Sequence, residues 1–347
     1  MAWICEDGSC EIRNEQFLPY NLYLETVLEK SLESIDTMVN NITNFYYWCA
    51  SRVLTLDRVY AKEILNSIGM PQAQTDKERA RIALTYHCLS LTDIYWVKEE
   101  NEQVTFSKIN LYENHLSGSF VDISLRGKQM TVENSELIAD DLGTKGYFPK
   151  AWIREKDGFY LLKDGGSEVV QKELLASRVC QCFSCNQVVY ESYFYNGEET
   201  TRSKLISSLE MSIVPMEYFT IYAENHGISV SSYIENLDGY SFHMMNILDY
   251  LIGNTDRHWG NWGVLVDNKT NQPLRLYDLM DFNKSFECYE TLDGGRCLTR
   301  KNMTQKQAAI EGVEKVGLNQ IKEVKKEWFD DREKWEMFQR RLLLLAR

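Results

Sequence analysis

The chain has 347 residues, of which 44% are hydrophobic and 12% aromatic. It is therefore long enough for a large core and two lobes, and its composition excludes a disordered protein. The formal net charge of −13 argues against nucleic acid or an anionic membrane as the main partner, because both bind basic surfaces. The acidic amino terminus lacks a secretory hydrophobic region and no apolar run reaches membrane-spanning length, so we expect a cytoplasmic protein.

The cysteines raise the question of a metal site. Nine of them in a chain without an export signal indicate reduced thiols. A structural zinc site usually needs four ligands in two spaced pairs. No second pair at suitable spacing accompanies Cys180, Cys182 and Cys185, so we expect these three to be small buried residues where a helix leads to a strand.

The first third of the chain predicts a helical region followed by strands. Residues 17–70, including the apolar positions from Leu22 to Leu32, have helical patterning, and residues 77–91 predict a further helix. Residues 92–126 alternate in the manner of strands, most clearly at Ile94–Val97. No repeat or low-complexity linker interrupts the chain, so residues 1–129 are predicted to pack on the next lobe as an accessory region.

The region 130–213 has the features of an ATP-binding lobe. A turn containing two glycines precedes a strand at 151–153, and a second strand, Phe159–Lys163, ends in a lysine. A loop between strands can present backbone N–H groups to phosphates, and glycine permits the close approach. The candidate ATP-binding residues are therefore Gly143, Thr144, Lys145, Gly146 and Lys163.

A glutamate, Glu173, follows Lys163 after ten residues. Glu173 lies inside a helical run from Glu168 to Cys182. Protein kinases pair a lysine on a strand with a glutamate on the following helix, and this pair fixes the α and β phosphates of ATP. The same order of elements predicts a pair between Lys163 and Glu173, with Glu168 as the fallback partner. We expect Met211–Pro215 to cross between the lobes, where adenine meets backbone and apolar groups.

The stretch 240–286 carries the most specific pattern. An apolar helix ends at Gly253, a usual helix stop. Two alternating runs then flank a polar loop at 267–272 and predict a β-hairpin. The candidate site residues are the polar side chains in the turn before the hairpin and at the end of the hairpin. They are Asp256, Arg257, His258, Asn261, Asp278 and Asp281.

Phosphoryl transfer from ATP needs a carboxylate that orients the attacking hydroxyl, and an amide and a second carboxylate that hold Mg²⁺. Asp256 and Asn261 have the Asp-x-x-x-x-Asn spacing of a kinase catalytic loop. Asp256 is therefore the candidate catalytic base, and Asn261 a candidate ligand with the oxygen donor that Mg²⁺ prefers. Arg257 and His258 are expected to structure this loop.

The second magnesium ligand is either Asp278 or Asp281. Both follow a hydrophobic pair at the end of the hairpin. We favour Asp281, because Asp-Phe-Asn resembles the Asp-Phe-Gly of protein kinases, and Asn283 can adopt the left-handed conformation as glycine does.

These residues resemble a known family. Asp256-Arg257-His258-x-x-Asn261 is the loop of phosphoinositide lipid kinases and of the bacterial HipA-like protein kinases, and GNTDRHWGNWG and LYDLMDFNKSF resemble the HipA-like branch. The resemblance spans roughly residues 130–345. It implies an α+β, bilobal protein-kinase-like fold, with a sheet-rich ATP-binding lobe at 130–213 and a mainly helical catalytic lobe at 214–347. It also implies ATP and Mg²⁺ as cofactors and a Ser or Thr hydroxyl of a protein, or of the chain itself, as acceptor.

Three other functions stay open. A phosphoinositide-type lipid kinase shares the loop, although the negative charge speaks against it. A nucleotidyl (AMP) transferase on the same fold is the second, and a non-catalytic nucleotide-binding module is the third. HipA-like kinases often pair with a small DNA-binding antitoxin, so the resemblance raises a small antitoxin partner as an expectation, without direct binding of nucleic acid or membrane by this chain. Residues 284–303 fall where an activation or substrate segment would lie, and 304–347 are predicted to be helical.

Overall fold

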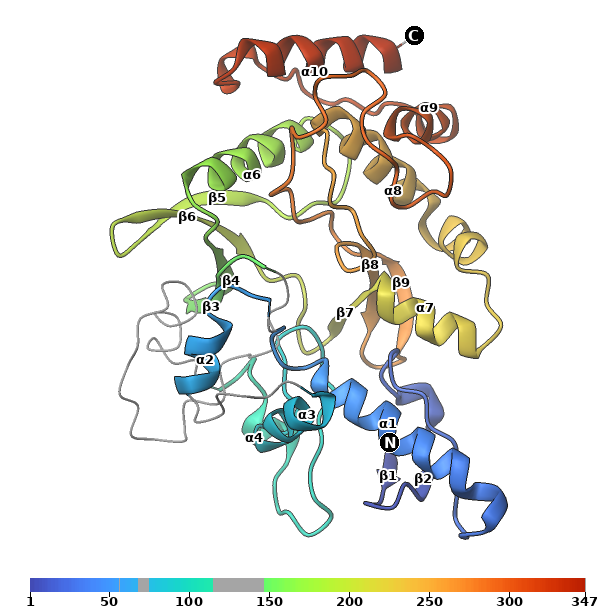
Figure 1. Ribbon diagram of the computed structural model, residues 1–347. Helices are drawn as coiled ribbons and strands as arrows, with labels where there is room; N and C mark the ends of the chain where they lie inside the picture. Colours follow the sequence, from blue (N-terminus) through green and yellow to red (C-terminus); the bar gives the residue numbers. More distant parts are fainter. Residues whose placement is uncertain (56, 68–74, 115–146, 347) are drawn as a thin grey trace.

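The structure, a computed structural model, describes residues 1–55, 57–67, 75–114 and 147–346. Within these residues, helices combine with antiparallel sheets, so the predicted α+β class is confirmed. Figure 1 shows N-terminal helices at one end of the molecule, sheets in the middle and C-terminal helices at the other end. The predicted turn of Gly143, Thr144, Lys145 and Gly146 lies outside the described residues.

A four-stranded antiparallel sheet has the strand order β3-β4-β6-β5. Asn196 and Gly197, between its last two strands in sequence, both have positive φ, the geometry of a tight hairpin turn that matches the twist of the strands. The helix α6 (Ser167–Cys180) follows β4 and lies beside this sheet (Figure 1). The strands are β3 (Lys150–Glu155), β4 (Gly158–Lys163), β5 (Tyr190–Tyr195) and β6 (Glu198–Lys204).

A second antiparallel sheet joins β7 (Met211–Pro215), β8 (Gly263–Asp267) and β9 (Gln272–Leu276). The predicted hairpin is thus confirmed, and the segment expected to cross between lobes is a strand that pairs with β8 along its whole length. Gly263 is required at this pairing, because a Cβ there would lie 2.1 Å from the main-chain oxygen of Val214.

The helix α8 (Val230–Ile252) leads to the predicted catalytic loop and ends, as predicted, at Gly253 in the left-handed conformation. It is kinked at Asp238, whose φ and ψ are −158° and 58°. The Asp238 carboxylate accepts the N–H of Ser241 at 3.1 Å and the N–H of Leu276 at 3.0 Å. The kink therefore caps the second half of α8 and attaches it to β9.

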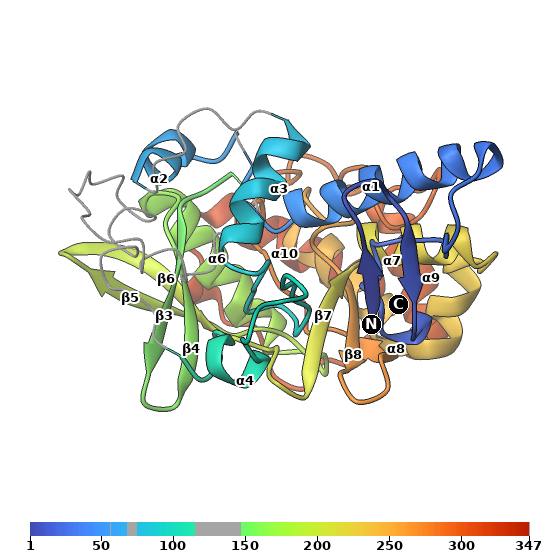
Figure 2. The same ribbon diagram turned by 90° about the horizontal axis from the view of Figure 1, so that it is seen from below.

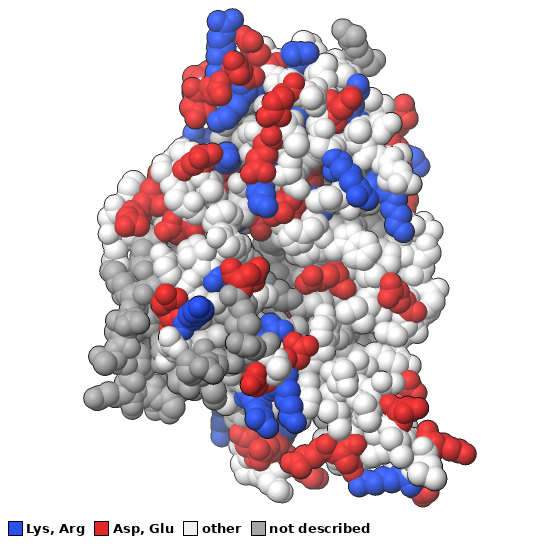
Figure 3. Space-filling model, viewed as in Figure 1, with Lys and Arg blue, Asp and Glu red and all other residues white. Residues whose placement is uncertain are grey.

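The C-terminal helices α9 (Gln305–Val316) and α10 (Arg332–Leu345) cover α8, whereas α7 (Met216–Asn225) packs near β7 and β8. One hydrophobic core reaches from α6 through α8 and β8 to α10, with fully buried side chains that include Val179, Leu248, Val264 and Phe338. In the described part of the chain, each helix is too short or too polar to cross a bilayer. On the face in Figure 3, acidic and basic side chains are interspersed.

The N-terminal region has a separate core that includes Trp48 of α1, Ala83 of α3 and Phe159 of β4, so this region packs on the four-stranded sheet. Helices α1 and α3 lie side by side (Figure 2). The helix predicted over 77–91 ends at Thr85. The elements here are β1 (Ala2–Ile4), β2 (Cys10–Ile12), α1 (Ile35–Ala50), α2 (Ala61–Ser67), α3 (Asp76–Thr85) and α4 (Phe106–Ile109).

The helix predicted at Leu22–Leu32 is wrong, because the backbone of this segment bonds to distant parts of the chain. Val27 exchanges two main-chain hydrogen bonds with Cys10, at 2.8 and 3.1 Å. The buried side chain of Asn41 on α1 accepts the N–H of Glu25 at 2.9 Å and donates to its carbonyl at 2.8 Å. These long-range bonds replace the hydrogen bonds of a helix.

The strand predicted at Ile94–Val97 is also wrong. Local bonds take the place of a strand ladder: the N–H of Tyr95 donates to the Asp93 carboxylate at 3.0 Å, and the N–H of Val97 donates to the carbonyl of His87 at 2.9 Å. An aspartate side chain offers the backbone this alternative to a sheet. The alternating apolar residues instead pack on the N-terminal core.

The role of Asn41 predicts a measurable loss of stability. Its side chain also donates to the carbonyl of Gly8 at 3.1 Å, so Asn41→Ala leaves three backbone groups without this partner. We expect the free energy of unfolding to fall by roughly 2–3 kcal/mol. The exposed neighbour Asn40 is the matched control, and Asn40→Ala should change stability by less than about 0.5 kcal/mol. Urea denaturation measures both, and equal losses would contradict the role of Asn41.

Candidate active site

Lys163, the last residue of β4, lies between two carboxylates. Its Nζ is 2.9 Å from Glu173 Oε1 and 2.5 Å from Asp281 Oδ1. The side chains of Lys163 and Glu173 are only 4% and 1% exposed, so the pair is almost fully removed from water. The structure therefore brings together the lysine and glutamate that the order of elements predicted. Glu168, the fallback partner, instead binds Lys172 at 2.8 Å on the surface.

The register of the sheet explains why these groups meet. Lys150 on β3 and Thr201 on β6 are the cross-strand partners of Lys163, and such partners project from the same face of a sheet. The hydroxyl of Thr201 donates to Glu173 Oε2 at 2.7 Å, which fixes the second carboxylate oxygen. A one-residue slip of β4 would move Lys163 to the opposite face and break the cluster.

The charges of this cluster compensate one another. Burial alone would lower the pKa of Lys163, but Asp281 and Glu173 raise it above its ordinary value. Burial alone would raise the pKa of Asp281, but Lys163 and then Lys150 hold it below its ordinary value. Burial lowers the pKa of Lys150 to about 8, against the opposing effect of Asp281. The cluster thus favours the ionised forms of Lys163 and Asp281.

The backbone at Asp281 aims its carboxylate at Lys163. Asp281 itself is left-handed, with φ of 60°, so the expectation that Asn283 takes this conformation is wrong. The N–H of Asp281 donates to the hydroxyl of Tyr190 at 3.0 Å. The next residue, Phe282, is fully buried, with its ring 5.7 Å from that of Tyr190. The bend therefore lets Phe282 enter the core while Asp281 faces Lys163. Aspartate tolerates the left-handed region better than most residues.

Arg257 ties the predicted catalytic loop to the segment of Asp281. Its Nε and Nη2 donate to the two carboxylate oxygens of Asp249 at 2.9 and 3.0 Å. Its Nη1 donates to the carbonyl oxygens of Asn261 at 2.8 Å and Met280 at 2.5 Å. Because Met280 directly precedes Asp281, one buried guanidinium joins the segments of both candidate metal ligands.

Asn254 provides a second link. Its Oδ1 accepts the N–H of Asp256 at 3.1 Å, while its Nδ2 donates to the carbonyl of Asp281 at 3.5 Å and to Asp249 Oδ1 at 3.1 Å. The Nδ2 of Asn261 donates to the carbonyl of Asp256 at 2.9 Å, which leaves its Oδ1 to accept a ligand. These bonds link the backbone segments that carry Asp256, Asn261 and Asp281.

The remaining loop residues have simpler roles. His258 is exposed, and its Nδ1 accepts the N–H of Gly260 at 3.0 Å, so this side chain bonds within the loop. The Asp256 side chain is 25% exposed, and its Oδ1 lies 3.6 Å from the Nζ of Lys284. This carboxylate is therefore more accessible to a substrate than the buried cluster at Lys163.

Asp278 has a different partner. Its carboxylate accepts a hydrogen bond from Arg275 Nη1 at 2.7 Å, so it belongs to an ion pair beside β9. Asp281 and Asn261 offer the hard oxygen donors that suit Mg²⁺, which usually takes one or two protein oxygens together with phosphates and water. Both carboxylates thus take part in an ion pair, and Asp281, which lies at the Lys163 cluster, stays the candidate ligand.

Cys180, Cys182 and Cys185 make no metal centre in the structure. Cys180 and Cys182 are buried at the end of α6 and just beyond it, where burial raises the pKa of each thiol. Over the described ranges, no three His, Cys, Asp or Glu side chains converge as a metal site. Cys180 and Cys182 are thus buried as expected, whereas Cys185 is only partly buried.

Sequence reasoning missed several members of the site. Lys150, Tyr190 and Thr201 occupy ordinary strand positions, and their sequence surroundings carry no motif. Only the strand register places Lys150 and Thr201 beside Lys163. Asn254 and Asp249 look like helix-end residues in the sequence, and their role depends on contacts with Arg257 and Asp281.

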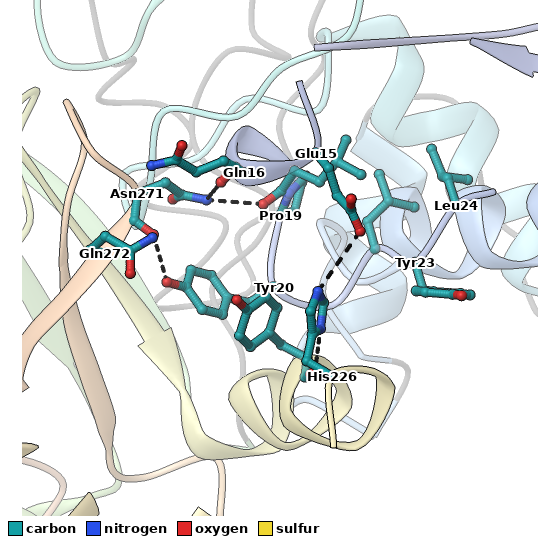
Figure 4. Close-up of a pocket in the computed structure, with 12 residues that line it drawn as sticks. Glu15, Gln16, Pro19, Tyr20, Tyr23, Leu24, His226, Asn271 and Gln272 are labelled. Carbon is teal, nitrogen blue, oxygen red and sulfur yellow. Dashed lines mark hydrogen bonds and ion pairs between the residues drawn. The ribbon is translucent and has the colours of Figure 1, made fainter. Parts of the chain in front are cut away.

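A separate cavity of about 230 Å³ lies between the N-terminal segment, the end of α7 and the loop between β8 and β9 (Figure 4). In it, Glu15 Oε1 faces His226 Nε2 at 3.9 Å, and the hydroxyl of Tyr20 donates to the carbonyl of Asn271 at 2.7 Å. None of the candidate catalytic residues lines it. This cavity is therefore separate from the ion cluster at Lys163.

No protein-family model and no curated protein matches the sequence. Solved structures that are similar to the chain include the following two. One is the Shewanella oneidensis MR-1 toxin–antitoxin system HipA and HipB with its operator DNA, with a TM-score of 0.48 and 10% identity, covering 87% of this chain and 84% of that chain. The other is the Helicobacter pylori proinflammatory kinase CtkA, with a TM-score of 0.42 and 13% identity, covering 57% of this chain and 88% of that chain. At these identities the similarity concerns the fold alone.

The lowered pKa of Asp281 predicts how stability depends on pH. A carboxylate whose pKa is lower in the folded state contributes stability that is present above the unfolded value, about 3.9, and is lost as the pH falls below it. Between about pH 5 and pH 3, the free energy of unfolding should therefore fall more steeply for the wild type than for Asp281→Asn. Urea denaturation at constant ionic strength measures both slopes. Parallel curves would show that Lys163 does not hold this carboxylate ionised.

Proposed function

We propose that this chain is an ATP- and magnesium-dependent phosphotransferase that phosphorylates a Ser or Thr hydroxyl of a protein. The observation that carries the proposal is the buried ammonium of Lys163, bound by Glu173 and Asp281. An ammonium held in this way is the group with which protein kinases fix the α and β phosphates of ATP. Arg257 and Asn254 link the same cluster to the loop of the candidate base. These links support the proposal that the cluster and the loop belong to a single site.

Each residue has a role that its contacts support. Thr201 holds Glu173, and Glu173 holds Lys163 at a position where its ammonium can bind phosphate oxygens. Asp281 and Asn261 would hold Mg²⁺, which when bound neutralises phosphate charge. Arg257 keeps the backbone of both segments in place, so little reorganisation is needed when a nucleotide binds.

Asp256 is the group that receives the proton. The acceptor oxygen forms a bond to the γ-phosphorus while the bond from that phosphorus to the bridging oxygen breaks, and ADP leaves. The hydroxyl proton passes to the Asp256 carboxylate. The partial exposure of Asp256 supports this role, because a protein hydroxyl must reach it. The resemblance of the motifs to HipA-like kinases extends the proposal to a small antitoxin partner.

Substitutions at the cluster test the proposal. The purified chain is incubated with Mg²⁺ and γ-labelled ATP, with and without casein as acceptor, and labelling and intact mass are measured. Lys163→Met, Asp256→Asn and Asp281→Asn should each lower transfer on the order of 100-fold or more. Asp278→Asn is the matched comparison for Asp281→Asn, and it should retain transfer because its carboxylate binds Arg275.

The same samples separate the competing functions. Calorimetry should show weaker Mg-ATP binding for Lys163→Met but not for Asp256→Asn, because only the first contacts the nucleotide in this scheme. An adenylyl mass increment would favour nucleotidyl transfer, and labelling of phosphoinositides would favour a lipid kinase. ATP binding without any transfer would leave a nucleotide-binding module. Each of these results would contradict the proposed function.

A further inference from the structure

Lys284 approaches the candidate base from a different element. It lies three positions after Asp281, and its Nζ is 3.6 Å from Asp256 Oδ1. Among the described residues, no other Lys or Arg forms an ion pair with Asp256. The nearby cations are used elsewhere: Lys163 binds Glu173 and Asp281, and Arg257 binds Asp249. The charge next to the candidate base is therefore that of Lys284.

The main chain fixes this approach. The N–H of Thr255 donates to the carbonyl of Lys284 at 3.2 Å, and the N–H of Phe286 donates to the carbonyl of Ile252 at 2.7 Å. The hydroxyl of Thr255 also donates to Glu287 Oε2 at 2.7 Å. Three bonds thus attach the segment after Asp281 to the segment before Asp256. The backbone of Lys284 is therefore held beside the segment that carries Asp256.

The cluster at Lys163 and the pair at Lys284 differ in accessibility. The Lys163 and Glu173 side chains are almost fully buried, whereas Lys284 and Asp256 are 45% and 25% exposed. An exposed ion pair contributes little to folding stability. A lysine placed on the accessible side of the candidate base is therefore better suited to the acceptor half of the site than to holding the fold together.

We propose that Lys284 is a positioning residue: its ammonium holds the Asp256 carboxylate in the orientation that accepts the proton of the acceptor hydroxyl. This inference rests on the proposed function and assigns the acceptor side of that site. Displacement of a reacting group by about 1 Å can lower a rate on the order of 100-fold. Loss of Lys284 should therefore lower the rate of transfer without weakening nucleotide binding, which depends on Lys163.

Three variants test this role. Lys284→Met should lower kcat by about 10- to 100-fold, with KM for ATP, the Kd of Mg-ATP and the melting temperature near wild-type values. Lys284→Arg keeps the positive charge and should restore most of the activity. Lys269, an exposed lysine in the loop between β8 and β9, is the matched control, and Lys269→Met should behave as wild type. Initial rates of phosphate transfer, calorimetry and thermal unfolding provide the measurements.

A double variant shows whether Lys284 acts through Asp256. In the Asp256→Asn background, adding Lys284→Met should cause no further loss of transfer, because residues that act as a unit are not additive. A further loss would overturn the positioning role, as would a weakened Mg-ATP affinity, a melting temperature lowered in step with activity, or wild-type rates in Lys284→Met. If the wild-type chain transfers no phosphate, the proposed function fails as well, whereas an active wild type with an unaffected Lys284→Met removes only this inference.

Discussion

The ammonium of Lys163 imposes the main constraint on this structure, because a charge buried to this extent must be compensated. Its two carboxylate partners come from separate parts of the chain, Glu173 on α6 and Asp281 after β9. Removing either partner would leave an uncompensated charge in a low-dielectric site, which is strongly destabilising. The strand, the helix and the segment that follows the hairpin must therefore meet at one point, and this meeting point joins the four-stranded sheet to the mainly helical part of the chain.

A second buried cation extends the constraint to the loop. All the hydrogen bonds of Arg257 described above go to protein groups: the Asp249 carboxylate and the carbonyls of Asn261 and Met280. Arg257 is thus a structural clamp, whereas Lys163 is the cation to which the proposed function assigns phosphate binding. The pair of Lys284 and Asp256 lies nearer to solvent. Burial consequently decreases from Arg257 and Lys163 to the pair of Lys284 and Asp256.

The sequence predicted the parts of this arrangement that depend on local chemistry. Gly253 ends α8 because glycine adopts the left-handed conformation without strain, and the alternating runs after it pair as β8 and β9. The order of strand, lysine, helix and glutamate anticipated the contact between Lys163 and Glu173. The helix that did not form has a tertiary origin. Residues near Glu25 have helical patterning, yet their backbone groups form hydrogen bonds with Asn41 and Cys10. A local sequence pattern cannot predict a bonding partner that lies so far away along the chain.

The sequence by itself determined which side chains are candidates for the chemistry, because carboxylate, amide and lysine groups at these spacings are few and the turns between them depend on neighbouring residues. Only the tertiary structure set Asp281 apart from Asp278 by its surroundings. Both follow a hydrophobic pair at the end of one hairpin, and they differ in the partners that folding supplies, Lys163 for one and Arg275 for the other. Strand register likewise brought Lys150 and Thr201 to the cluster. Register and burial arise from contacts between distant segments, and spacing along the chain does not encode them.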